Sequence, residues 1–251
     1  MGNFYENFSM HTEYGAVAAT AAAIIIFGGI YVAWDYASRA LKRKHVLSRS
    51  MSIGVLHGGK LSLQRMINYH QARADPQIAD RPENDLNSLL NATHPDLWKL
   101  RSAVAKLEMS GKEKEAVRTL EKALEKARKD QKAHEAYEIE MLLVEMLIYK
   151  GDFGKASECK CLEHVQISDA RRPLYKAILH ILSEHPEDEA SKYWKDFEAI
   201  RIHFLWQPSV QEDEVLDVVV SNFEEFKEVV NLLKNDIQEA GEAKKRKKTQ
   251  K

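Results

Sequence analysis

The stretch Gly54–Lys60 is the part of the sequence closest to a known chemical motif. It reads GVLHGGK and nearly matches the phosphate-binding loop GxxxxGK[ST], in which backbone amides and a lysine cradle phosphates. Leu61 stands where a serine or threonine should hold magnesium, and no apolar strand precedes the stretch. A flexible turn explains these residues better, so an enzyme that binds nucleotide is only the third alternative for function.

A second group with chemical potential is formed by Cys159, Cys161 and His164. On a helix Cys161 and His164 would share a face, whereas Cys159 would point elsewhere. Two ligands do not complete a four-coordinate zinc site, and cysteines two apart on a helix are poorly placed for a disulfide. We therefore expect no metal, no cofactor and no disulfide framework, which favours a reducing compartment.

The remaining polar residues show no pair of carboxylates and no nucleophile with a base at a usable spacing, so we expect a protein that is not an enzyme. The chain has 37 basic and 38 acidic residues and a formal net charge of −1. This balance gives no argument for nucleic acid as a partner, and no small-molecule substrate is predicted.

The distribution of charge points instead to a membrane. Residues 15–34 carry no charge, and as a helix they would span about 30 Å, the thickness of a hydrocarbon core. Residues 1–14 contain acids but no lysine or arginine. The chain after the apolar run is basic, with Arg39, Lys42, Arg43, Lys44 and Arg49. We therefore predict a transmembrane helix over residues 15–36, a translocated N-terminus and a cytosolic C-terminal part.

This basic flank has two interpretations: it sets the topology, or it also binds anionic lipid. A cleaved signal peptide is the main rival for the apolar run, but its N-terminal region should be basic. A moderately hydrophobic span with a basic flank resembles the signal anchors of mitochondrial and plastid outer membranes. An anchor of the endoplasmic reticulum would look much the same.

Three segments after residue 97 share one pattern: an apolar helix, a tight turn, an alanine five residues later and a second helix. The turns are 40 and then 34 residues apart. Their turn positions and alanines are Gly111 with Ala116, Gly151 with Ala156, and His185 with Ala190. The longer first spacing predicts that the second helix of the first unit extends through Ala127.

This pattern resembles the tetratricopeptide repeat family, whose unit is a helical hairpin of about 34 residues. The strongest match is YKGDFGKA at residues 149–156. The resemblance implies an all-α fold of about three hairpins whose first helices line a groove that binds proteins. It places Arg101, Glu140 and Tyr175 along that groove. Members that hold chaperone tails use lysine, asparagine and arginine; Ala105, Glu145 and Leu179 stand there, so such tails are not expected.

The chain past residue 206 departs from the repeat. A capping box, Ser221 with Glu224, predicts a last helix that covers the open end of the repeats. We expect six parts: a translocated tail (1–14), the transmembrane helix (15–36), a basic juxtamembrane segment with a helix (37–83), the repeat domain (84–206), a linker with the capping helix (207–240) and a disordered basic tail (241–251).

The sequence thus predicts a membrane-anchored scaffold that binds a protein partner at an organelle surface, as an adaptor, receptor or assembly factor. The alternative is a permanent structural subunit of a larger membrane complex. The partner's identity is open in both cases.

Overall fold

The computed structural model describes residues 49–58, 61, 64–69, 82–92, 95–205, 220 and 222–249. These residues form helices and turns and contain no strand, which confirms the all-α class. The expected transmembrane helix over residues 15–36 lies outside the described residues, as does the basic flank before Arg49. Within the described part of the chain, no helix is both long and apolar enough to cross a membrane.

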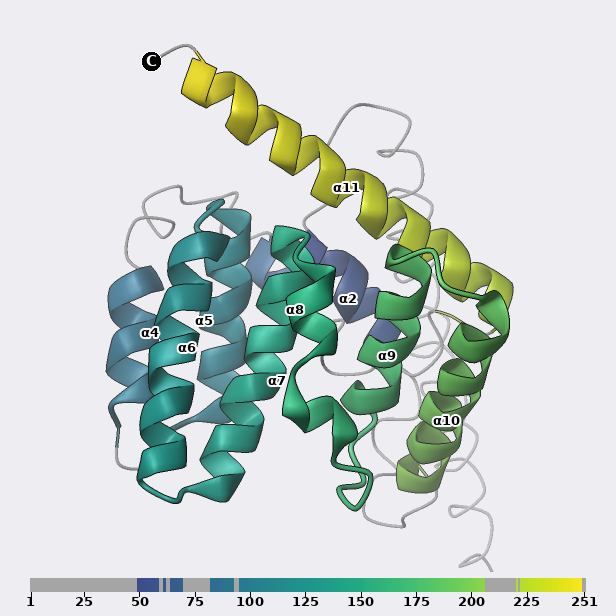
Figure 1. The fold of residues 1–251 in the computed structure, drawn as a ribbon, viewed down its shortest axis with the longest axis horizontal. Coiled ribbons are helices and arrows are strands. Elements are labelled where there is room, and N and C mark those ends of the chain that lie inside the picture. The colour runs from purple at the N-terminus through teal and green to yellow at the C-terminus, as the bar shows by residue number, and fades with distance from the viewer. Residues whose placement is uncertain are drawn as a thin grey trace, which may run out of the picture. The chain divides into compact units, whose positions relative to one another are not determined.

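The helices follow one another in antiparallel pairs (Figure 1). In chain order they are α2 (Arg49–His57), α4 (Pro82–Leu90), α5 (Leu97–Met109), α6 (Glu113–Lys129), α7 (Ala133–Lys150), α8 (Phe153–Ser157), the 3₁₀ helix η2 (Lys160–Glu163), α9 (Arg171–Leu182), α10 (Glu187–Leu205) and α11 (Phe223–Thr249). We call α5, α7 and α9 the inner helices, because they pack side by side and face α2.

Four turns between these helices share one hydrogen-bond pattern. In each, a residue with positive φ follows the helix, and the next N–H donates to the carbonyl five residues earlier, as in Lys112 to Leu107. The positive-φ residues are Gly111, Gln131, Gly151 and Glu184. The turn expected at His185 therefore lies at Glu184, one residue earlier than the sequence pattern predicted.

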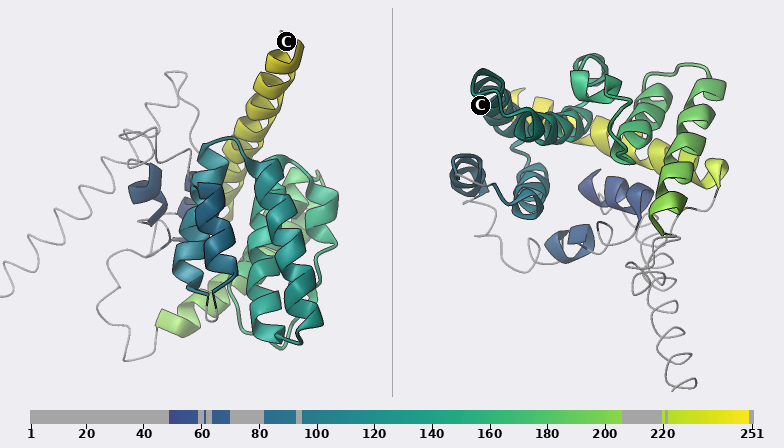
Figure 2. Two further views of the ribbon diagram at one scale, coloured as in Figure 1. Left: turned by 90° about the vertical axis from the view of Figure 1, so that its left-hand side faces the viewer. Right: turned by 90° about the horizontal axis from the view of Figure 1, so that it is seen from below.

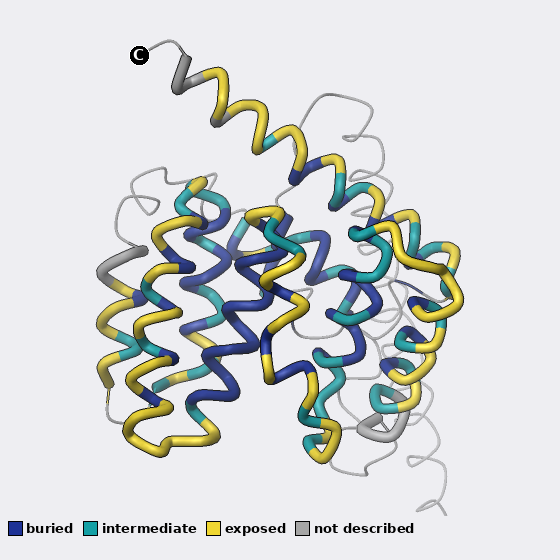
Figure 3. Tube along the Cα trace, in the orientation of Figure 1, coloured by how far each residue is buried: buried dark blue, intermediate teal, exposed yellow. Residues whose placement is uncertain are grey.

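The core is centred on α7, which is buried at every position from Ala136 to Tyr149 (Figure 3). Helices α5, α6 and α9 all pack against it. The three alanines singled out in the sequence, Ala116, Ala156 and Ala190, have no exposed surface. The first pair's second helix, α6, is extended as expected, and its Leu120, Leu124 and Ala127 are all buried.

Helix α2 is an unexpected part of this domain. It lies on the inner side of the curve formed by α5, α7, α9 and α10, where it contacts α5, α9 and α11 (Figure 2). Its Ile53 and Leu56 have no exposed surface. The compact unit begins at Leu47, so the folded domain starts well before residue 84. Gly54 lies inside this helix, so the described part of Gly54–Lys60 is mostly helix.

Helix α11 begins at Phe223, and the Asn222 side chain caps it by accepting from the Glu225 N–H at 2.9 Å. The cap therefore lies one residue after the expected Ser221. Its apolar stripe packs on the domain through Phe226, Val229, Val230, Leu233 and Ile237. A Cβ at Gly151 would lie 3.1 Å from Ile237 Cγ2, so glycine there serves both the positive φ of 80° and the close approach of α11.

The basic tail is helical to Thr249, although disorder was expected from residue 241. Alanine, glutamate and lysine are good helix formers, and an existing helix extends without a new nucleation cost. Glu242 and Arg246 add an ion pair one turn apart. The described side chains from Gly241 to Arg246 are exposed, and α11 projects beyond the inner helices (Figure 1).

Because of Asp236, the packing of α11 on the rest of the domain depends on pH. Asp236 is buried, and its Oδ2 has no hydrogen-bond partner among the described residues. Burial raises its pKa to about 7, with help from Glu239 and Glu108 and against the pull of Arg49. The unfolded chain releases this proton near pH 4, whereas the folded chain keeps it to about pH 7. Stability is therefore lost as the pH rises through this window.

We expect Asp236→Asn to leave stability nearly unchanged at pH 4 and to raise the free energy of unfolding at pH 8 by on the order of 2 kcal/mol. Urea denaturation across this pH range measures the difference. Glu228→Gln, at an exposed position of the same helix, serves as the control and should give parallel pH profiles. A constant offset between Asp236→Asn and the native chain would contradict the prediction.

Candidate functional site

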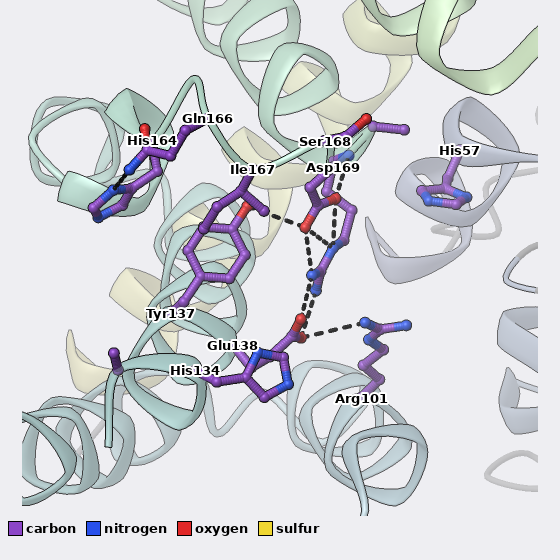
Figure 4. Close-up of a pocket in the computed structure, with 13 residues that line it drawn as sticks. His57, Arg101, His134, Tyr137, Glu138, His164, Gln166, Ile167, Ser168 and Asp169 are labelled. Atoms are coloured by element: carbon purple, nitrogen blue, oxygen red, sulfur yellow. Dashed lines mark hydrogen bonds and ion pairs between the residues drawn. The ribbon is translucent and has the colours of Figure 1, made fainter. Parts of the chain in front are cut away.

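A cavity of about 740 Å³ opens between the inner helices and the segment that leads into α9 (Figure 4). Helix α2 contributes His57, α5 contributes Arg101 and α7 contributes His134, Tyr137 and Glu138. The segment from His164 to Arg171 supplies the opposite wall. The cavity is thus built from parts of the chain that are more than 100 residues apart.

A chain of alternating charges crosses the cavity floor. Arg171 donates to Asp169 at 2.6 Å and to Glu138 at 2.7 and 3.0 Å. Glu138 in turn accepts a longer bond of 3.3 Å from Arg101. Figure 4 shows this sequence of contacts running from the α9 side to α5. Because each carboxylate faces a guanidinium, this series of ion pairs links the three inner helices.

The environment keeps these carboxylates ionised. Burial alone would raise the pKa of Glu138, but the hydrogen bonds and charge of Arg171, with help from Arg101, hold it below the ordinary value. The pKa of Asp169 is likewise lowered by Arg171 against the effect of burial. Neither group is therefore suited to carry a proton near neutral pH, which argues against general acid catalysis here.

Within this series of charged residues, Arg101 is the one whose N–H donors are not all paired with described residues. Its side chain is 25% exposed, and its Nε is buried without a partner among the described residues. Its backbone carbonyl is fixed by a 2.8 Å bond from Arg65 Nη1. A guanidinium has five N–H donors, and the single bond to Glu138 uses one of them. An acceptor that enters the cavity can bind the N–H groups on the exposed part of this side chain, but not the buried Nε.

Two other side chains make the cavity wall neutral. His57 is partly buried, and this burial lowers its pKa to about 4, so the imidazole carries no charge at neutral pH. Tyr137 donates to Asp169 at 3.1 Å, and burial followed by the nearby Asp169 charge raises the pKa of its hydroxyl. The cavity therefore combines the partly exposed guanidinium of Arg101 with two uncharged hydrogen-bonding side chains, His57 and Tyr137.

The three residues that the sequence predicted to line a groove lie in different environments. Arg101 lines the cavity. Glu140 is buried at the convex side, where it accepts from Arg128 at 2.7 Å and from the Lys160 N–H at 3.0 Å. Tyr175 is buried and donates to Glu145 at 3.0 Å. Only Arg101 is therefore in a position to meet a ligand, whereas Glu140 and Tyr175 hold the inner helices to their neighbours.

Arg49 was grouped with the basic membrane flank, but the structure places it in the protein interior. Its side chain is 8% exposed and pairs with Glu108 at 2.8 Å and with Glu113. Burial opposes the charge, yet the two glutamates raise the pKa of this arginine above its usual value. The other named flank residues, Arg39, Lys42, Arg43 and Lys44, lie outside the described residues.

Cys159 precedes η2 and Cys161 lies within it, and both thiols are buried and form no disulfide. Burial raises the pKa of Cys159 to about 12 and raises that of Cys161 further, with Glu140 acting in the same direction. Thiols with such pKa values are poor nucleophiles at neutral pH. Among the described residues, no group of three histidine, cysteine or acidic side chains is arranged to hold a metal ion.

Sequence reasoning missed Glu138, Asp169 and Arg171. Each is a common surface residue, and only the fold brings them into one buried chain. One signal was present: three glutamates, Glu138, Glu140 and Glu145, stand within the mostly apolar stretch Ala136–Tyr149 of α7. A carboxylate inside a buried helix requires a cationic or hydrogen-bonding partner, so their presence points to arginines that must lie opposite.

Searches against protein-family models, curated proteins and solved structures find no match to this chain. The function proposed below therefore rests on the charges, contacts and cavity just described.

Proposed function

We propose that this chain is a membrane-anchored, tetratricopeptide-like scaffold that binds a protein partner through the cavity at the inner helices. The observation that carries the proposal is Arg101, a partly exposed arginine that lines an open cavity of about 740 Å³ and makes one side-chain hydrogen bond among the described residues. Such a cavity fits one or two side chains of a partner, since concave sites with a few fixed polar groups are the usual places of recognition.

The chemistry of the floor supports binding more than catalysis. Its two carboxylates, Glu138 and Asp169, are paired with Arg171 and Arg101, and His57 carries no charge at neutral pH. Fixed charges and hydrogen-bond donors orient a ligand without exchanging protons with it. The membrane anchor adds location: it would hold the cavity at an organelle surface, where neighbouring proteins are concentrated.

The test compares three full-length chains in cells, each with a proximity-labelling enzyme fused after Lys251. These are the native chain, Arg101→Ala, and Lys99→Ala as a control on the exposed face of the same helix. We expect Arg101→Ala to lose at least tenfold labelling of specific cytosolic neighbours, and Lys99→Ala to lose none. Equal neighbours for all three would reject the cavity as the binding site. Labelling of lumenal proteins would reject the proposed topology.

A further inference from the structure

Helix α2 sits on the inner helices as a ligand sits in a groove. It has only nine residues, too few to form a stable helix alone in water. Its helical state therefore depends on the surface that surrounds it, formed by α5, α9 and α11. Residues on nearly every side of it are buried, and Figure 2 shows it inside the curve of the inner helices.

Three residues of α2 anchor it: Arg49, Ile53 and Leu56. They are spaced at i, i+4 and i+7, so they lie along one stripe of the helix. Ile53 and Leu56 are fully buried, and Arg49 is nearly so. This is the spacing by which a helix is recognised in a groove. Small residues at other positions, Ser50, Ser52 and Gly54, are also buried and let the surrounding helices come close.

The groove holds the guanidinium of Arg49 with groups from three helices. Nε donates to Glu108 of α5 at 2.8 Å, Nη2 donates to Glu113 of α6, and Nη1 donates to the Tyr149 carbonyl of α7 at 2.7 Å. Two buried carboxylates thus face one arginine at this point. A neutral residue in its place would lose the ion pairs with both of them, so the site favours a cation.

The groove also recognises the start of the helix. The Glu108 carboxylate accepts from the backbone N–H groups of Arg49 at 3.2 Å and of Ser50 at 3.3 Å. These N–H groups have no partner within their own helix, and a negative charge is favourable beside them. Glu108 therefore binds two features together: an arginine side chain and the helix N-terminus that carries this arginine.

We propose that this groove is a receptor for a partner helix with the pattern Arg-x-x-x-Ile-x-x-Leu, and that α2 is its resident occupant. The proposal rests on the proposed function as a protein-binding scaffold and names the class of partner. A partner helix of this kind displaces α2 and takes its contacts with Glu108 and Glu113. Because His57 at the end of α2 lines the cavity, displacement also removes one wall of the site that contains Arg101.

The test uses a fluorescent peptide with the sequence of residues 47–60 and the full-length chain in lipid nanodiscs. The site is emptied by Arg49→Gln, Ile53→Ser and Leu56→Ser together. We expect the peptide to bind the emptied chain at least tenfold more tightly than the native chain, whose groove is filled. The same peptide carrying Arg49→Gln should bind neither chain. A folded emptied chain that takes up no peptide overturns the proposal, as does equal binding to both chains.

Hydrogen exchange of the native full-length chain gives a second test that does not depend on the variant folding. If α2 leaves its groove while the domain stays folded, its amides exchange at least a hundredfold faster than those of α7. Equal exchange rates for α2 and α7 would show that α2 leaves only on global unfolding and overturn the proposal. Neither readout involves Arg101, so failure here is separate from failure of the cavity as a binding site.

Discussion

Replacing Arg65 with methionine lowers the free energy of unfolding by about 3–5 kcal/mol, because the change strands a buried carboxylate. The Arg65 side chain is 1% exposed, and its Nη2 lies 2.5 Å from Glu145 Oε1. Glu145 also accepts from the hydroxyls of Tyr149 at 2.5 Å and Tyr175 at 3.0 Å. Two neutral donors do not replace a full positive charge in a dry site.

The double variant Arg65→Met with Glu145→Gln separates the loss of the pair from the stranded charge. A neutral glutamine can still accept from both tyrosines, so we expect the double variant to recover at least half of the lost stability. Arg118→Met, at an exposed position of α6, is the matched control and should change stability by less than about 0.5 kcal/mol. Urea denaturation measures all four chains. A single variant as stable as the double one would refute the role given to Arg65.

A fragment that begins at Leu61 should be less stable than one that begins at Leu47 by at least about 5 kcal/mol. The shorter fragment lacks α2, so it loses the burial of Ile53 and Leu56, worth about 1.5–3 kcal/mol each. It also leaves Glu108 and Glu113 without Arg49 in a site closed to solvent. We expect it to bind a hydrophobic dye and to aggregate, whereas the longer fragment unfolds cooperatively.

Glu108→Gln together with Glu113→Gln in the shorter fragment provides the control, because it removes the two charges that Arg49 pairs with but not the uncovered apolar surface. We expect partial recovery of stability. Equal denaturation curves for the two unsubstituted fragments would show that α2 contributes nothing. The result also decides how the adaptor and the permanent-subunit interpretations can be told apart. Aggregation of a fragment that starts at Leu61 reports the missing helix and not a missing partner.

Local patterns were the most reliable guide to the fold. The helical composition and the positions of Gly111 and Gly151 identified the all-α class, two of the turns and the extended α6, because these features depend on residues close in sequence. The third turn was displaced because Glu184, not glycine, adopts the positive φ. A non-glycine residue in that conformation gives little sign of itself in a sequence.

Charged residues were harder to place from the sequence. Arg49 was assigned to the basic flank of the membrane segment and Tyr175 to a groove surface, yet both are buried. An arginine in a basic stretch is usually exposed, because no acidic residue lies near it in the sequence. Its burial becomes favourable only when an acidic partner comes from elsewhere in the chain. Arg49 pairs with Glu108 and Glu113, which follow it by about sixty residues in the sequence. No local rule connects positions that far apart.

By itself, the sequence determined the helical class, the turns at Gly111 and Gly151 and the expectation of an apolar anchor with a basic flank. Each depends on periodicity or composition within about twenty residues. The tertiary structure alone decided that α2 belongs to the domain, that the acids of α7 face Arg65, Arg171 and Arg128, and that Arg101 keeps free donors in a cavity. The physical reason is that a buried charge is tolerated only beside its countercharge, and the fold decides which residues meet.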